Sequence, residues 1–327
     1  AAMASSFVVS VGFFIAANAP NYWVFVAAQA GLIGAIGCST AFGPLVADVS
    51  LWFRKRRGVA IAIVASGNYL AGAIWPPALS AAVAEFGWRN AYMAIGVLVL
   101  VTMLPLTFLL RRRASLDDVP TAAQTASGRK LDGTPMLHGL LILAGLACCV
   151  AMSMPQVHLV AYCVDLDYGA ARGSAMLSVL LAGGVISRLA SGWISDRIGG
   201  GATLIIGSFL QCLALLFYIP FDGLVSLYIV SALFGLAQGG IVPSYALIVR
   251  DHFPAREAGC RISLVLTSTV LGMALGGWLS GEIFDATGSY RLAFLHGVGW
   301  NLLNLAIASW VLFGPFGRGR RQAVGMA

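Results

Sequence analysis

The chain has 327 residues, of which 59% are hydrophobic and 10% are charged, and its formal net charge is +7. An ordinary soluble domain carries about 25% charged residues, so this composition excludes that class and indicates a membrane protein. The six cysteines are scattered, mostly in apolar segments, without metal-ligand spacing. We expect them to be small packing residues, and we expect no metal and no cofactor.

Ten apolar segments follow one another along the chain. We expect each to be a transmembrane helix, because lipid cannot satisfy the main-chain polar groups of an open strand or loop. The predicted helices span 1–17, 22–47, 58–84, 89–110, 138–163, 174–195, 202–220, 224–249, 259–282 and 291–314. The predicted fold class is therefore an all-α membrane protein.

A polar stretch rich in charge, Ser, Thr and Gly interrupts the apolar segments at 111–135 and is typical of a flexible linker. We therefore divide the chain into four parts. They are an incomplete four-helix N-terminal bundle (1–110), a cytoplasmic linker (111–136), a six-helix C-terminal bundle (137–316) and a cytoplasmic tail (317–327).

The basic residues fall unevenly on the gaps between the apolar segments. With a cytoplasmic N-terminus, sixteen of the 20 Lys and Arg residues lie inside, three lie outside, and Arg188 lies within the membrane. The positive-inside rule thus favours cytoplasmic N- and C-termini. Most of the positive charge then meets the inner membrane surface and not a nucleic acid. We expect an integral multi-pass protein, with a bacterial inner membrane as its location.

An internal repeat appears when the chain is shifted by about 201 residues, which aligns Gly58 with Gly259 and Gly87 with Gly288. Residues 1–110 then correspond to roughly 202–314. Parallel repeats of this kind are typical of transporters, with the substrate site between the halves. The first half has no counterpart of the two helices in 138–195, so we expect an N-terminal helix pair to be missing from this sequence.

Arg188 is the one charge inside an otherwise apolar helix pattern that ends at Asp196 and Arg197. Arg188 precedes Asp196 by eight residues, which places it roughly 12 Å inside the helix end. A guanidinium at that depth costs at least ~2.5 kcal/mol and is tolerated mainly beside a watery cavity or a counter-charge. Arg188 is therefore the first candidate for a functional residue.

Three stretches give the chain a family resemblance: LWFRKRRGVAIAIVASGNYLAG (51–72), FGWRNAYMAIG (86–96) and the long segment 158–199. They resemble the major facilitator superfamily, near the monocarboxylate transporters and the bacterial oxalate/formate-type antiporters. The resemblance implies two pseudo-symmetric bundles, in which the ten helices are helices three to twelve of twelve. It also identifies GWISDRIG (192–199) as the second copy of the superfamily's loop motif.

The resemblance implies that Arg188 is the arginine of the eighth helix that pairs with a substrate carboxylate. Related monocarboxylate carriers often have an aspartate one turn earlier, where this chain has Gly184, and this difference favours the binding of an anion. The eleventh-helix lysine of oxalate carriers has no counterpart in 267–276, so a monocarboxylate is favoured over a dianion. Further candidates for substrate contact, which could equally be packing residues, are His158, Gln238, Asn68, Tyr69 and Tyr162.

Residues at the inner helix ends are candidates for a gate. The set comprises Gly192, Asp196, Arg197 and Arg57, where ion pairs could hold one state of an alternating cycle. The alternative is topological anchoring by positive charge, which we favour for the RKRRG run (54–58).

The predicted function is secondary transport of a small organic anion by alternating access, with proton coupling or anion exchange and with no enzymatic step. We expect a monomer in the lipid bilayer with no nucleic-acid partner. Two alternatives remain open. One is a non-transporting, truncated or receptor-like membrane protein, and the other is a carrier of neutral or cationic drug-like solutes.

Overall fold

The computed structural model describes residues 2–38, 57–109 and 133–314. Every element in these ranges is helical, which confirms the predicted all-α class. The elements are α1 (Ala2–Ala17), α2 (Tyr22–Ala27), the π-helix η1 (Ala28–Cys38), α4 (Arg57–Phe86), α5 (Trp88–Leu109), α7 (Pro135–Asp165), α8 (Ala170–Ile198), α9 (Gly200–Phe217), α10 (Leu224–Gln238), α11 (Ile241–His252), α12 (Ala255–Thr287) and α13 (Tyr290–Phe313). When α10 and α11, which only the turn at Gly239 and Gly240 divides, are counted as one span, these ranges hold ten helical segments, as predicted.

Seven helical stretches within the described ranges are long and apolar enough to cross a bilayer. They are Trp88–Thr107, Pro135–Asp165, Ala170–Ile198, Gly200–Phe217, Leu224–His252, Glu257–Thr287 and Tyr290–Phe313. Two shorter apolar helices, Met3–Ala17 and Tyr22–Gly37, belong to the first part of the chain. The linker predicted at 111–136 lies mostly outside the described residues, and the tail predicted at 317–327 lies wholly outside them.

The chain forms two compact units. The first contains Ala1–Ala65 and Trp75–Val119, and the second contains Pro120–Ala327 together with Ser66–Ile74 from the middle of α4. In the first unit α1 packs on α5, and the rings of Phe13, Phe25 and Trp88 gather around Tyr92. The four-helix and six-helix division of the chain stays a prediction.

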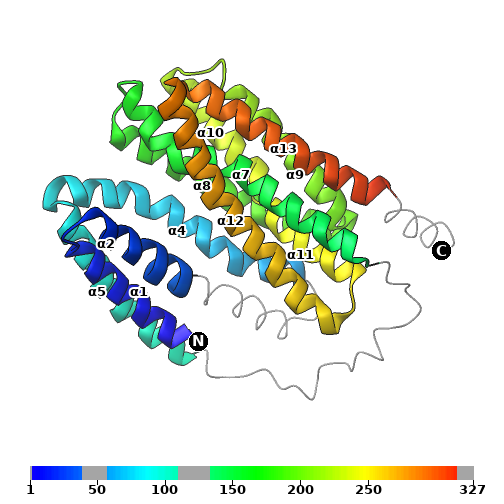
Figure 1. Ribbon diagram of the computed structural model, residues 1–327, viewed down its shortest axis with the longest axis horizontal. Coiled ribbons are helices and arrows are strands. Elements are labelled where there is room, and N and C mark those ends of the chain that lie inside the picture. The colour runs from blue at the N-terminus through cyan, green and yellow to red at the C-terminus, as the bar shows by residue number, and fades with distance from the viewer. Residues whose placement is uncertain (1, 39–56, 110–132, 315–327) are drawn as a thin grey trace. The chain divides into compact units, whose positions relative to one another are not determined.

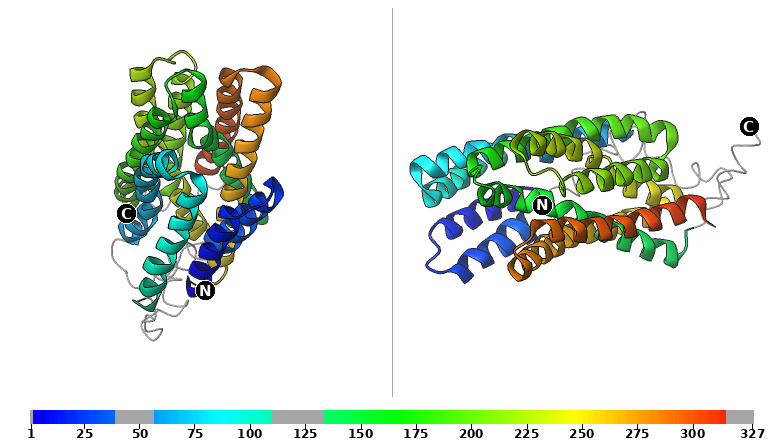
Figure 2. Two further views of the ribbon diagram at one scale, coloured as in Figure 1. Left: turned by 90° about the vertical axis from the view of Figure 1, so that its left-hand side faces the viewer. Right: turned by 90° about the horizontal axis from the view of Figure 1, so that it is seen from above.

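In the second unit α7 packs against α8, α12 and α13, and α9 packs against α10, α11 and α13 (Figure 1). Figure 2 shows α12 and α13 running side by side. Almost every side chain of α7 between Ala144 and Pro155 is buried, and most of them are small. Small residues let helix backbones approach closely, which is how helices associate where no water is present.

The ends of these helices follow from local sequence. Thr134 accepts a hydrogen bond from the main-chain N–H of Leu137 and Pro135 occupies the first helical turn, both of which favour a helix start. Gly199 joins α8 to α9 at φ +85° and Gly288 ends α12 at φ +62°. Both values lie in the left-handed region that only glycine adopts at no steric cost.

Two sequence predictions need correction. The segment predicted as one helix at 224–249 is two helices, α10 and α11, which are separated at Gly239 and Gly240. Cys260 is exposed and is not a packing residue, whereas Cys148, Cys149, Cys163 and Cys212 are buried free thiols.

Candidate functional site

A contact between α8 and α10 brings two helix backbones together along glycines. A Cβ at Gly235 would overlap the carbonyl oxygen of Leu180, and a Cβ at Gly183 would lie 3.1 Å from the carbonyl oxygen of Ala232. Gly235 and Gly239 are spaced four residues apart, so they share one face of α10. This small-residue spacing is the common signature of close helix association in membranes.

The backbone of Gly239 is turned towards α8 at the break between α10 and α11. Its N–H donates to the Ser187 hydroxyl at 3.1 Å. Its carbonyl accepts from Arg188 Nε at 3.0 Å. In a regular helix this carbonyl would accept from the N–H of residue 243, but Pro243 has none. The side chain of Arg188 therefore supplies the hydrogen bond that the helix cannot.

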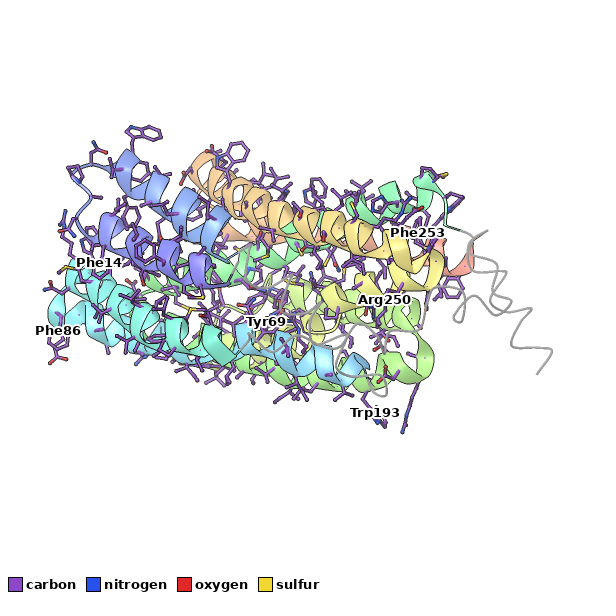
Figure 3. All side chains as sticks on the ribbon, turned by 90° about the horizontal axis from the view of Figure 1, so that it is seen from below. Phe14, Tyr69, Phe86, Trp193, Arg250 and Phe253 are labelled. Atoms are coloured by element: carbon purple, nitrogen blue, oxygen red, sulfur yellow. The ribbon has the colours of Figure 1, made fainter. Side chains whose placement is uncertain are left out.

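The Arg188 guanidinium is buried, with the residue 6% exposed, and it has an aromatic neighbour on one face. Its Cζ atom lies 4.3 Å from the centre of the Tyr69 ring. Tyr69 belongs to the part of α4 that joins the second unit, and Figure 3 shows it midway along α4. A cation over an aromatic face gains about 2 kcal/mol when both are desolvated, so Tyr69 partly offsets the cost of the buried charge.

Gly184 explains how Tyr69 reaches this position. A Cβ on Gly184 would lie 3.0 Å from Tyr69 Cδ1, so the ring fills the space in front of the glycine. This is where the resemblance places an aspartate in related monocarboxylate carriers. In this chain the aromatic face of Tyr69 takes up that space, and the contact links α4 to α8.

Gln238 is the residue just before the break, and it is fully buried. Its Oε1 accepts a hydrogen bond from Gln156 Nε2 of α7 at 2.7 Å. Its Nε2 has no hydrogen-bond partner among the described residues. A buried amide N–H₂ without an acceptor is costly, and such groups need an explanation, for example a missing ligand or water.

The other candidates for substrate contact lie in different surroundings. His158 is half-buried, and its Nε2 donates to the carbonyl of Gly277 on α12 at 2.8 Å, so it links α7 to α12. Tyr162 packs its ring against Tyr290 and Phe294, with centroids 4.8 and 5.8 Å away. Asn68 is exposed, one residue before Tyr69.

Three of the predicted gate residues, Gly192, Asp196 and Arg197, lie near the C-terminal end of α8. Asp196 and Arg197 are exposed, and Asp196 forms no ion pair with any described residue. Arg197 instead stacks on Trp193, with its Cζ 3.5 Å from the ring centroid, and Trp193 projects from the surface (Figure 3). The carbonyl of Gly192 accepts from the Ser195 hydroxyl at 2.9 Å. The side chain of Arg57 lies outside the described residues.

Sequence reasoning missed Ser187, Gly239, Pro243 and Gln156 as parts of this contact. The sequence does contain a signal for the helix break, because Gly239-Gly240 is followed three residues later by Pro243, and this pattern interrupts a helix. A cavity of about 520 Å³ lies elsewhere, lined by His138, Glu257, Cys260, Arg261 and Leu264, and Arg188 does not border it. No group of acidic, His or Cys side chains in the described ranges could hold a metal.

Comparisons with known proteins agree with a transporter fold. The sequence profile of the Major Facilitator Superfamily matches residues 1–260 and again 203–324. The second match begins close to residue 202, where the sequence repeat is predicted to begin. Monocarboxylate transporter 13 of Rattus norvegicus is 24% identical over 270 residues, which cover 81% of this chain and 62% of that protein. The agnestins efflux protein of Paecilomyces divaricatus is 26% identical over 296 residues, covering 90% and 66%.

Among solved structures, the human organic anion transporter MFSD10 superposes with a TM-score of 0.64 at 17% identity, covering 94% of this chain and 76% of that one. This likeness shows the fold. The chain spans about 62% of the length of the rat protein it matches. The profile match covers nearly the whole chain, and the chain is a multi-pass membrane protein that belongs to the Major Facilitator Superfamily.

Proposed function

We propose that the chain carries out secondary transport of a small organic anion of the monocarboxylate class, and that Arg188 binds the carboxylate. The observation behind this proposal is a buried guanidinium at mid-helix, held against a broken helix by Gly239 and against an aromatic ring by Tyr69. Guanidinium matches carboxylate through two parallel hydrogen bonds and stays charged at any physiological pH.

Two further features support a ligand at this place. Discontinuous helices near mid-membrane commonly frame the substrate sites of transporters, because their free main-chain groups line a cavity. The amide of Gln238, directly beside the break, presents a buried Nε2 with no partner among the described residues. We therefore assign Gln238 and Gln156 to contacts with the uncharged part of the substrate. Asn68 and His158 remain candidates for the path to the site.

The cell membrane of a bacterium, cytoplasmic termini and coupling to protons or to a counter-anion complete the proposal. The positive-inside distribution of Lys and Arg supports the orientation. In this proposed orientation the end of α8 that carries Asp196 and Arg197 faces the inner surface, and an inner gate there is part of the same proposal.

Uptake by the full chain in proteoliposomes tests the proposal with labelled pyruvate, lactate, formate, oxalate and an aromatic acid. We expect saturable uptake of at least one monocarboxylate, and Arg188→Gln should lower kcat/KM about 100-fold or more, as losing a buried charged contact does. The kcat/KM of Arg188→Lys should lie between those of the unmodified chain and Arg188→Gln, because lysine keeps the charge but loses the planar guanidinium. Arg172→Gln, an exposed arginine on the same helix, is the matched control and should transport normally.

The rival function is export or uptake of neutral or cationic drug-like solutes, which the similarity to an efflux protein supports. Transport of such a solute that persists in Arg188→Gln, together with no monocarboxylate uptake by the unmodified chain, would favour the rival and reject the anion carrier.

A further inference from the structure

The Gly239 carbonyl that accepts from Arg188 Nε lies four residues before a proline, Pro243. In an uninterrupted helix the carbonyl of residue 239 is occupied by the N–H four residues later. Pro243 stands at that position and has no N–H, so the helix leaves this carbonyl without its main-chain donor. An unfilled carbonyl at membrane depth is strongly disfavoured, and Arg188 fills it at 3.0 Å.

We propose that Pro243 is a positioning residue for the substrate-binding arginine, acting through the Gly239 carbonyl. This inference rests on the proposed function of Arg188. The guanidinium is planar. The Tyr69 ring, 4.3 Å from Cζ, sets the orientation of this plane, and the hydrogen bond from Nε–H sets how the group is rotated within it. The guanidinium plane is then fixed before an anion arrives.

The second hydrogen bond of Gly239 keeps its carbonyl aimed at α8. Its N–H donates to the Ser187 hydroxyl, so both polar groups of this residue are committed to the same helix. Glycine is required here, because a Cβ would lie 2.6 Å from the main-chain nitrogen of Arg188. An arginine that is already held in place lowers the entropic cost of binding the anion. Loss of this prepositioning therefore weakens substrate binding.

Pro243→Ala tests this in the full chain by restoring an N–H at residue 243, which then competes with Arg188 for the Gly239 carbonyl. With labelled pyruvate or lactate as substrate, KM should rise about tenfold, the usual effect of losing a hydrogen bond to a charged group, while kcat stays within about twofold. Pro243→Ser also restores the N–H and serves if the alanine variant does not reach the membrane. Pro105→Ala, an exposed proline inside α5, is the control and should leave KM unchanged.

A double-mutant cycle separates positioning from a general effect on the helix. Lysine at 188 has no Nε–H in a planar fork, so in the Arg188→Lys background Pro243→Ala should change KM by less than about twofold. The same tenfold rise in both backgrounds would show a structural role and overturn the proposal, as would an unchanged KM in the single variant. If Arg188→Gln itself transports monocarboxylates normally, the proposed function fails first. If it does not transport while Pro243→Ala has a normal KM, only the positioning role fails.

Discussion

Two contacts in the second unit satisfy buried polar groups with different kinds of hydrogen bond. At the contact of α8 with α10 and α11, a charged side chain binds the main chain of a broken helix, and glycines bring the backbones close enough for it to do so. Where α13 meets α9 and α11, neutral side chains bind one another, and α13 and α9 continue without interruption. Under the proposed function the first contact serves a ligand and the second serves packing.

The neutral contact is built from Asn304, Ser208 and Tyr245. Asn304 Nδ2 donates to the Ser208 hydroxyl at 2.8 Å, and the Tyr245 hydroxyl lies 2.6 Å from Asn304 Oδ1. The same hydroxyl lies 3.0 Å from the carbonyl of Ala144, and Asn301 Nδ2 donates to the carbonyl of Ser208 at 2.7 Å. These bonds join four helices, and interhelical hydrogen bonds of this kind hold helices together in membranes.

The largest expected effect comes from closing the space that the α8 contact needs. Gly235→Ala places a methyl group against the Leu180 main chain, so the helices must separate, and overpacking of this kind costs about 1–3 kcal/mol or more. We expect a clearly lower melting temperature and loss of uptake. Gly139→Ala is the matched control, because a Cβ there meets nothing within 4 Å. Equal melting temperatures for the two variants would contradict the close packing described here.

A smaller effect is expected at the neutral contact. Asn304→Leu removes the bonds to Ser208 and Tyr245, and interhelical hydrogen bonds in membranes average about 0.6 kcal/mol. The melting temperature should fall by a few degrees, while the KM for a transported monocarboxylate stays the same. A changed KM with unchanged stability would show that this contact also takes part in substrate binding, and the comparison between the two contacts would fail.

The sequence predicts the fold well because its signals are strong and local. Long apolar runs define the helices, and a single charge inside one of them identifies Arg188 without any structure. The break at Gly239 was missed because the run at 224–249 is evenly apolar, although its Gly-Gly and Pro243 were visible. The position of Tyr69 over Arg188 could not be predicted, since it depends on how α4 packs against α8, far away in sequence.

For the predicted gate, the sequence motif identifies residues but not their contacts. Asp196 and Arg197 match a loop motif, but the motif alone does not identify their partners. Within the described residues Arg197 stacks on Trp193 of its own helix, one turn earlier. A sequence motif thus predicts that a residue has a role more readily than it predicts which contact carries that role.

The most direct test asks whether a carboxylate stabilises the folded protein through Arg188. The melting temperature of the purified full chain is measured with increasing lactate, pyruvate and the uncharged analogue lactamide. A ligand at 100 times its Kd adds about 2.7 kcal/mol of stability, so a bound carboxylate should raise the melting temperature visibly. We expect a rise with at least one of the two carboxylates, none with lactamide, and none in Arg188→Gln. An equal rise in Arg188→Gln, or a rise with lactamide alone, would contradict carboxylate binding by Arg188.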